Sequence, residues 1–185
     1  MTRTDLSGWL LIASFVLWFP AAVLPARIWT APHAERLTLI DEQRRRWQIV
    51  NLAIAAAAVL LVLGFGALAE PLRREGAPTL TDLSLALLLL GAPLWLASLV
   101  HRIVVARDGA AWAGALFLAW SVIANAAIVG FGAALVRSDL SGGWAGWTGI
   151  VLAALMLVEL LVTGDALPAL YHVGPAVIGV AVLLA

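Results

Sequence analysis

The stretch that decides the fold is WAGWTGIVLAALMLVELLVTGD, residues 144–165. Its first twenty residues contain a single charged side chain, Glu159. An α-helix rises about 1.5 Å per residue, so about 20 apolar residues cross the roughly 30 Å hydrocarbon layer of a membrane. The stretch therefore predicts a transmembrane helix that carries one acid.

The composition of the whole chain is also that of a membrane protein. Of its 185 residues, 63% are hydrophobic and 12% are charged, whereas soluble domains have about 45–50% apolar and about 25% charged residues. A chain of this length leaves room for one domain, so we expect residues 1–185 to form a single all-α transmembrane bundle. The formal net charge is zero, which gives no long-range attraction to nucleic acid.

The residue types that are missing exclude several chemistries. There is no Cys, so disulfides, thiolate metal sites and iron–sulfur clusters are excluded. All eleven basic residues are Arg, which excludes a Lys Schiff base to retinal or pyridoxal. Nucleotide-binding and hydrolase motifs are absent from the sequence as well. We predict no cofactor and no metal site, and the sequence leaves open whether the chain is an enzyme.

Apolar runs predict six transmembrane spans, with five as the alternative if the first or last is partial. The predicted spans cover residues 6–24, 47–69, 82–105, 110–136, 144–163 and 166–185. We expect Pro71 to end the second span, because proline has no backbone N–H to continue a helix.

The longest polar connection predicts an interfacial helix over residues 33–46. Within it, Asp41 precedes Arg45 by four residues, the spacing of a helical ion pair. The helix ends in Arg44, Arg45 and Arg46, which either orient the protein by the positive-inside rule or bind anionic lipid headgroups. Alternate connections carry seven and four arginines, which predicts a multi-pass protein of the inner (plasma) membrane with its N-terminus outside.

Glu159 is the strongest candidate for a functional residue. An acid inside a transmembrane run is unfavourable by about 2.5–3.5 kcal/mol at mid-membrane, so it needs a reason to be there. A neutral Glu can donate a hydrogen bond, hold a ligand or relay a proton. We expect Glu159, Asp165 and His172 to form a cluster. The alternatives are that Glu159 reaches the membrane interface and that the link after it is a solvated turn.

Further polar and aromatic side chains extend this candidate site. Asn125 lies near the middle of its span, where it either faces a ligand or hydrogen-bonds a neighbouring helix. Three deep Trp residues, Trp18, Trp95 and Trp120, either line an apolar pocket or pack in the core. The candidate ligand-binding set is Glu159, Asn125, Trp120, Asp165, Tyr171 and His172.

The last third of the chain resembles a six-span bacterial membrane family that is catalogued only as a domain of unknown function. The resemblance rests on residues 142–184, where GGWAGWTGIVLAALMLVELL follows a polar turn and leads, through a link that contains an acid and a proline, to a last span. It implies six spans and brings no catalytic residues with it.

Three functions are compatible with these patterns. The one we expect is binding of a lipid or an apolar small molecule between helices, around Glu159, Asn125 and the deep Trp residues. The second is a membrane-embedded lipid isomerase or cyclase that uses Glu159 as its acid. The third is a non-catalytic subunit of a homo- or hetero-oligomer, packed through small residues such as Gly142, Gly146 and Gly149.

Overall fold

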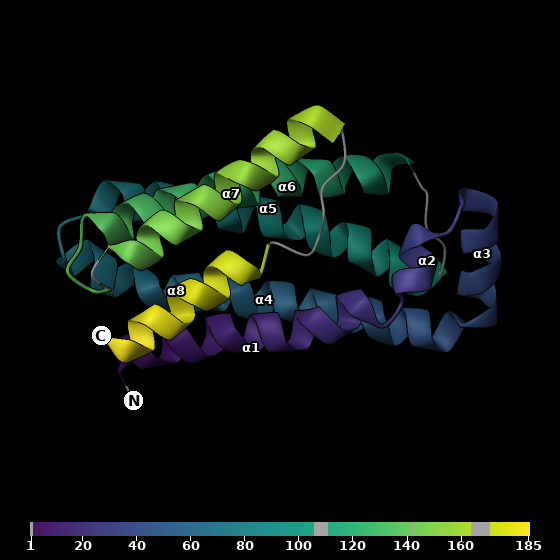
Figure 1. Cartoon of the computed structure of the whole chain (residues 1–185), viewed down its shortest axis with the longest axis horizontal. Helices are drawn as coiled ribbons and strands as arrows, with labels where there is room; N and C mark the ends of the chain where they lie inside the picture. Colours follow the sequence, from purple (N-terminus) through teal and green to yellow (C-terminus); the bar gives the residue numbers. More distant parts are fainter. Residues whose placement is uncertain (1, 106–110, 142, 164–170) are drawn as a thin grey trace.

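The computed structural model shows an all-α bundle whose long helices run side by side (Figure 1). It describes residues 2–105, 111–141, 143–163 and 171–185. Within this part of the chain the helices are α1 (Arg3–Val23), α2 (Ala26–Thr30), α3 (His33–Glu42), α4 (Arg44–Arg74), α5 (Pro78–Val105), α6 (Ala111–Val136), α7 (Trp144–Thr163) and α8 (Val173–Leu184). The predicted all-α class is confirmed.

Five of these helices, α1, α4, α5, α6 and α7, are long and apolar enough to cross a membrane. The protein is therefore a polytopic membrane protein. The sixth predicted span, residues 166–185, is described only from residue 171, and its helix α8 has 12 residues. Twelve residues reach about 18 Å, which is less than the roughly 30 Å that a crossing requires. Figure 1 shows α8 starting part-way along the bundle and running back beside α1.

The second span is longer than the sequence predicts. Helix α4 contains Pro71 and continues to Arg74, so the prediction that this proline ends the helix is wrong. Proline removes only one backbone hydrogen bond, and the helix persists for one more turn. The chain turns at Gly76, whose φ is +92°, a left-handed conformation that glycine adopts without steric cost.

Helices α2 and α3 lie at one end of the bundle, and α3 runs across the direction of the long helices (Figure 1). A small buried cluster holds them there, formed by Ile28, Ala31, Leu39, Ile40 and Trp47. The helix predicted over residues 33–46 is interrupted at Gln43, where α3 ends and α4 begins. Because this break lies between Asp41 and Arg45, the predicted ion pair between them does not form among the described residues.

Glycine pairs let neighbouring helices approach backbone to backbone. A Cβ atom on Gly179 of α8 would lie 2.7 Å from the carbonyl oxygen of Gly8 on α1. A Cβ atom on Gly132 of α6 would lie 2.6 Å from the carbonyl oxygen of Gly146 on α7. Real Cβ atoms essentially never come closer than 3.0 Å, so only glycine fits at these crossings.

Two of the small residues proposed above for contact with another chain are used inside this one. Gly146 packs on Gly132, and Gly149 faces the buried Ile178 of α8. The third, Gly142, lies outside the described residues. The prediction that Gly146 and Gly149 pack against another chain is therefore wrong, because close contact within the bundle already occupies them.

The apolar side chains divide between a packed centre and an outer shell. Phe65 of α4 and Phe131 of α6 stack in the centre with ring centroids 4.5 Å apart. On the outside, large apolar side chains such as Leu90 and Leu161 are 69% and 85% exposed. Continuous exposed apolar surface of this kind is unfavourable in water and stable in hydrocarbon, in agreement with a membrane-spanning bundle.

Candidate functional site

A hydrogen-bonded polar pair is buried between three helices at the middle of the bundle. Ser14, on α1, lies 2.6 Å from Nδ1 of His172 through its Oγ. The same oxygen lies 3.0 Å from the carbonyl oxygen of Ala57 on α4. Ser14 is fully buried and His172, which precedes the first residue of α8, is 4% exposed. The pair therefore ties α1, α4 and the start of α8 together.

The number of available protons fixes the direction of these hydrogen bonds. A serine hydroxyl has one proton, and a backbone carbonyl can only accept. When Ser14 donates to the oxygen of Ala57, its Oγ must accept from Nδ1–H of His172. We assign the tautomer of the imidazole on this ground. In a neutral imidazole protonated at Nδ1, the other nitrogen, Nε2, is an acceptor.

An aromatic ring covers one face of the imidazole. The ring of Trp18, one turn after Ser14 on α1, stacks on His172 at 5.3 Å between centroids and 18° between planes. Trp18 is 3% exposed. The sequence predicts that deep Trp residues either line a pocket or pack in the core. Trp18 packs in the core, on the buried ring of His172, and holds that ring in place.

An apolar groove of about 480 Å³ lies between α1, α8 and the start of α7. It is lined only by apolar side chains, namely Ile12, Phe15, Trp144, Val173, Ala176, Val177 and Val180. Phe15 follows Ser14 in the chain, and Val173 follows His172. Two residues of the lining are therefore immediate sequence neighbours of the hydrogen-bonded pair.

The predicted cluster of Glu159, Asp165 and His172 is only partly visible in the structure. Glu159 is half-buried near the C-terminal end of α7, beside Leu161 and Val162, which are 85% and 79% exposed. In the described part of the chain its carboxylate makes no hydrogen bond or ion pair, and its backbone oxygen accepts from Thr163 at 2.8 Å. Asp165 lies outside the described residues.

This end of α7 diverges from the start of α8 in Figure 1. None of the contacts described for His172 is with Glu159; they are with Ser14 of α1 and Trp18 of α1. The cluster stays a prediction, and the partner that the structure gives His172 is a serine that sequence reasoning did not select.

The remaining predicted ligand residues are distributed over the core. The side chain of Asn125 is 1% exposed, and its Nδ2 donates to the backbone oxygen of Ser121 at 2.8 Å. Its Oδ1 is buried without a hydrogen bond among the described residues. Trp120 is buried against Gly91 of α5. Tyr171 precedes His172 and meets the ring of Phe117 on α6 edge-on at 6.4 Å.

The three consecutive arginines lie where α4 begins, at the same end as α3. Arg46 is tied to the protein, because it donates to the backbone oxygen of Leu24 at 2.9 Å and to Oε1 of Gln43 at 3.1 Å. Arg44 and Arg45 are exposed. Among the described residues neither makes a hydrogen bond or an ion pair.

Metal-binding residues do not gather within the described part of the chain, where no three His, Cys, Asp or Glu side chains lie close enough to hold an ion. Comparison with protein-family models, with curated proteins and with solved structures finds no match to this chain. The resemblance of residues 142–184 to a six-span family therefore stays a prediction.

Proposed function

We propose that this membrane protein binds the hydrocarbon chain of a lipid or lipid-like molecule in the groove between α1, α7 and α8. The supporting observation is the groove itself, with about 480 Å³ of space and an entirely apolar lining. Ligand pockets are typically about 300–1,000 Å³ and mostly apolar. A second apolar depression, between α4 and α5, has only about 120 Å³ and is too small for this role.

The buried pair, whose sequence neighbours Phe15 and Val173 line the groove, suggests what the polar end of the ligand carries. His172 uses Nδ1 to donate to Ser14, which leaves Nε2 as a hydrogen-bond acceptor. An acceptor at membrane depth binds a donor, and the donor that apolar molecules most simply carry is a hydroxyl group. In this proposal the ligand is a long-chain alcohol or a lipid with a free hydroxyl group, with its chain along Phe15 and Val177.

Photolabelling of the purified full chain tests the proposal. The probe is a long-chain fatty alcohol that carries a diazirine, and the labelled residues are mapped by mass spectrometry. We expect labelling that saturates and that concentrates on Phe15 and Val177. Ala176 lines the groove and is only half-buried, so Ala176→Phe fills the groove and abolishes saturable labelling.

The matched control is Ala86→Phe, which places the same ring at an exposed position of α5 that does not line the groove. This variant is expected to label like the wild type. Two results would overturn the proposal: labels spread evenly over the lipid-facing surface, or Ala176→Phe labelled as efficiently as the wild type.

The orientation in the membrane is a separate proposal. We place the end that carries α2 and α3 at the cell interior, with the N-terminus outside, because arginines are more numerous at that end. The chain has no Cys, so single cysteines can be introduced on an unreactive background. Cysteines at the exposed positions Thr38 and Asp139 should react with a membrane-impermeant reagent from opposite sides, Asp139→Cys from outside.

A further inference from the structure

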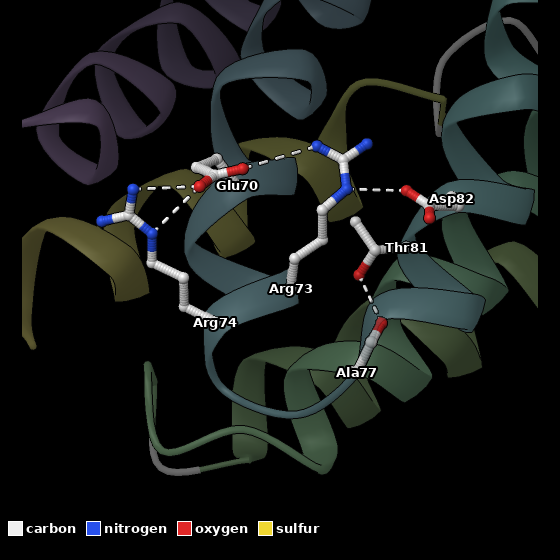
Figure 2. A network of polar contacts seen from close by, with 6 residues as sticks. All are labelled: Glu70, Arg73, Arg74, Ala77, Thr81 and Asp82. Atoms are coloured by element: carbon white, nitrogen blue, oxygen red, sulfur yellow. Dashed lines mark hydrogen bonds and ion pairs between the residues drawn. The ribbon is translucent and has the colours of Figure 1, made fainter.

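The two ends of the bundle differ in how their charges are balanced. At the end where α1 begins and α4 ends, the described residues include four arginines and five acids: Arg3, Arg73, Arg74, Arg137, Asp5, Glu70, Glu75, Asp82 and Asp139. Figure 2 shows two of these arginines with their acids, and Glu70 lies between Arg73 and Arg74. Arg73 also reaches Asp82, at 2.7 Å. This end neutralises its own positive charge.

Among the described residues at the other end, where α2 and α3 lie, arginines outnumber acids. Its described residues include six arginines and three acids: Arg27, Arg36, Arg44, Arg45, Arg46, Arg102, Glu35, Asp41 and Glu42. Some of these arginines serve the fold. Arg36 donates to the backbone oxygens of Trp29 and Ala31 at 3.1 and 3.2 Å, and Arg46 donates to the end of α1.

Arg44 and Arg45 have no such role in the described structure. Both side chains are exposed, and neither has an acid or a backbone oxygen as partner there. They also stand in the first turn of α4, which contains no acid. The start of a helix carries partial positive charge, so two cations at this place repel both the helix end and each other.

Their position places them at the polar boundary of the membrane. The apolar part of α4 starts within one turn of Arg45, and α3 lies across the bundle beside it (Figure 1). Side chains at this level meet the phosphates of lipid headgroups. A guanidinium group binds phosphate with two parallel N–H···O bonds.

We propose that Arg44 and Arg45 bind the phosphate of an anionic phospholipid in the leaflet at the α3 end of the bundle. The lipid supplies the negative charge that the protein itself provides at its other end through Glu70 and Asp82. This site is remote from the groove along α1 and α8, whose residues include Trp144 at the opposite end of the bundle. Either proposal can fail while the other holds.

The test compares lipid preference in purified full-length variants. The protein in detergent is titrated with phosphatidylglycerol and with phosphatidylcholine, and bound lipid is counted by native mass spectrometry. We expect the wild type to prefer the anionic lipid and the double variant Arg44→Gln/Arg45→Gln to lose about 30-fold of that preference. Each Arg near an anionic surface contributes about 1 kcal/mol, and 1.4 kcal/mol is tenfold.

The matched control is Arg3→Gln/Arg137→Gln, which removes the same charge from two exposed arginines at the opposite end. We expect it to keep the wild-type preference. The proposal is overturned if the Arg44/Arg45 variant also keeps that preference, or if the control loses it equally. It is likewise overturned if inorganic phosphate at millimolar concentration displaces the lipid, because a free anion would then be the ligand.

Discussion

Replacing Gly132 with alanine adds one methyl group where α6 and α7 meet backbone to backbone. The new carbon would lie 2.6 Å from the carbonyl oxygen of Gly146 and 2.8 Å from Cγ1 of Ile150. Since real Cβ atoms stay beyond 3.0 Å, the helices must separate by about 0.4 Å or more. Overpacking of this kind destabilises by about 1–3 kcal/mol, and alanine recovers about 0.8–1 kcal/mol through its helix propensity.

A second substitution in the same helix separates these two effects. Gly114 of α6 is exposed, and a methyl group added there would have no atom within 4 Å, so Gly114→Ala changes helix propensity without a clash. We expect the free energy of unfolding of Gly132→Ala to lie about 1–3 kcal/mol below that of Gly114→Ala. Reversible unfolding in mixed detergent and SDS micelles, followed by circular dichroism, measures the difference. Equal stability of the two variants would refute the role assigned to the glycine crossing.

Three further substitutions, and a control for the first of them, give distinct outcomes in the same unfolding assay. Ser14→Ala leaves Nδ1–H of the buried His172 without its acceptor and should destabilise the protein by about 1–3 kcal/mol. The control Ser121→Ala removes a hydroxyl bonded only within its own helix and should cost less than about 1 kcal/mol. Equal losses of stability in the two variants would argue against the buried pair. Gly8→Ala places a methyl group 2.8 Å from the oxygen of Gly179 and should lower stability by about 1–3 kcal/mol. A variant as stable as the wild type would contradict this prediction. Glu70→Gln weakens two partly exposed ion pairs and should cost less than about 1 kcal/mol, with the loss vanishing at high salt; a larger, salt-independent loss would contradict this.

The sequence predicts the long helices well because lipid imposes a simple rule on them. A run of apolar residues must satisfy its backbone within a helix, and α7 covers the same residues, 144–163, as its apolar run. The rule does not say at which level of the bundle an apolar helix begins. Residues 173–184 are as apolar as a span, and only their packing on α1 shows that this helix starts part-way along the bundle.

The candidate site was harder to predict, for a physical reason. Glu159 attracts attention because a carboxylate is costly in hydrocarbon. Ser14 gives no comparable signal, because a serine hydroxyl can hydrogen-bond to a carbonyl of its own helix at almost any position. Its partner His172 is 158 residues away in the chain, and no local pattern connects the two. The single hydroxyl in the middle of the first span was the only available signal.

The end of the bundle that carries α3 also shows that residue spacing alone does not predict tertiary contacts. A four-residue spacing predicts the Asp41–Arg45 ion pair only while the helix is continuous. The break at Gln43 accompanies the packing of α3 across the end of the bundle, where Leu39 and Ile40 share a buried cluster with Trp47 of α4. Tertiary packing of this kind is not visible in residue spacing.

The close crossing of Gly8 and Gly179 also sets an order of events during synthesis. The ribosome must add about 170 residues after Gly8 before the other side of this crossing exists, which takes roughly 10–30 s at usual rates of translation. Throughout that interval the glycine face of α1 is inserted but uncovered. A nascent chain of this protein therefore needs either lipid or the insertion machinery itself to shield that face until α8 arrives.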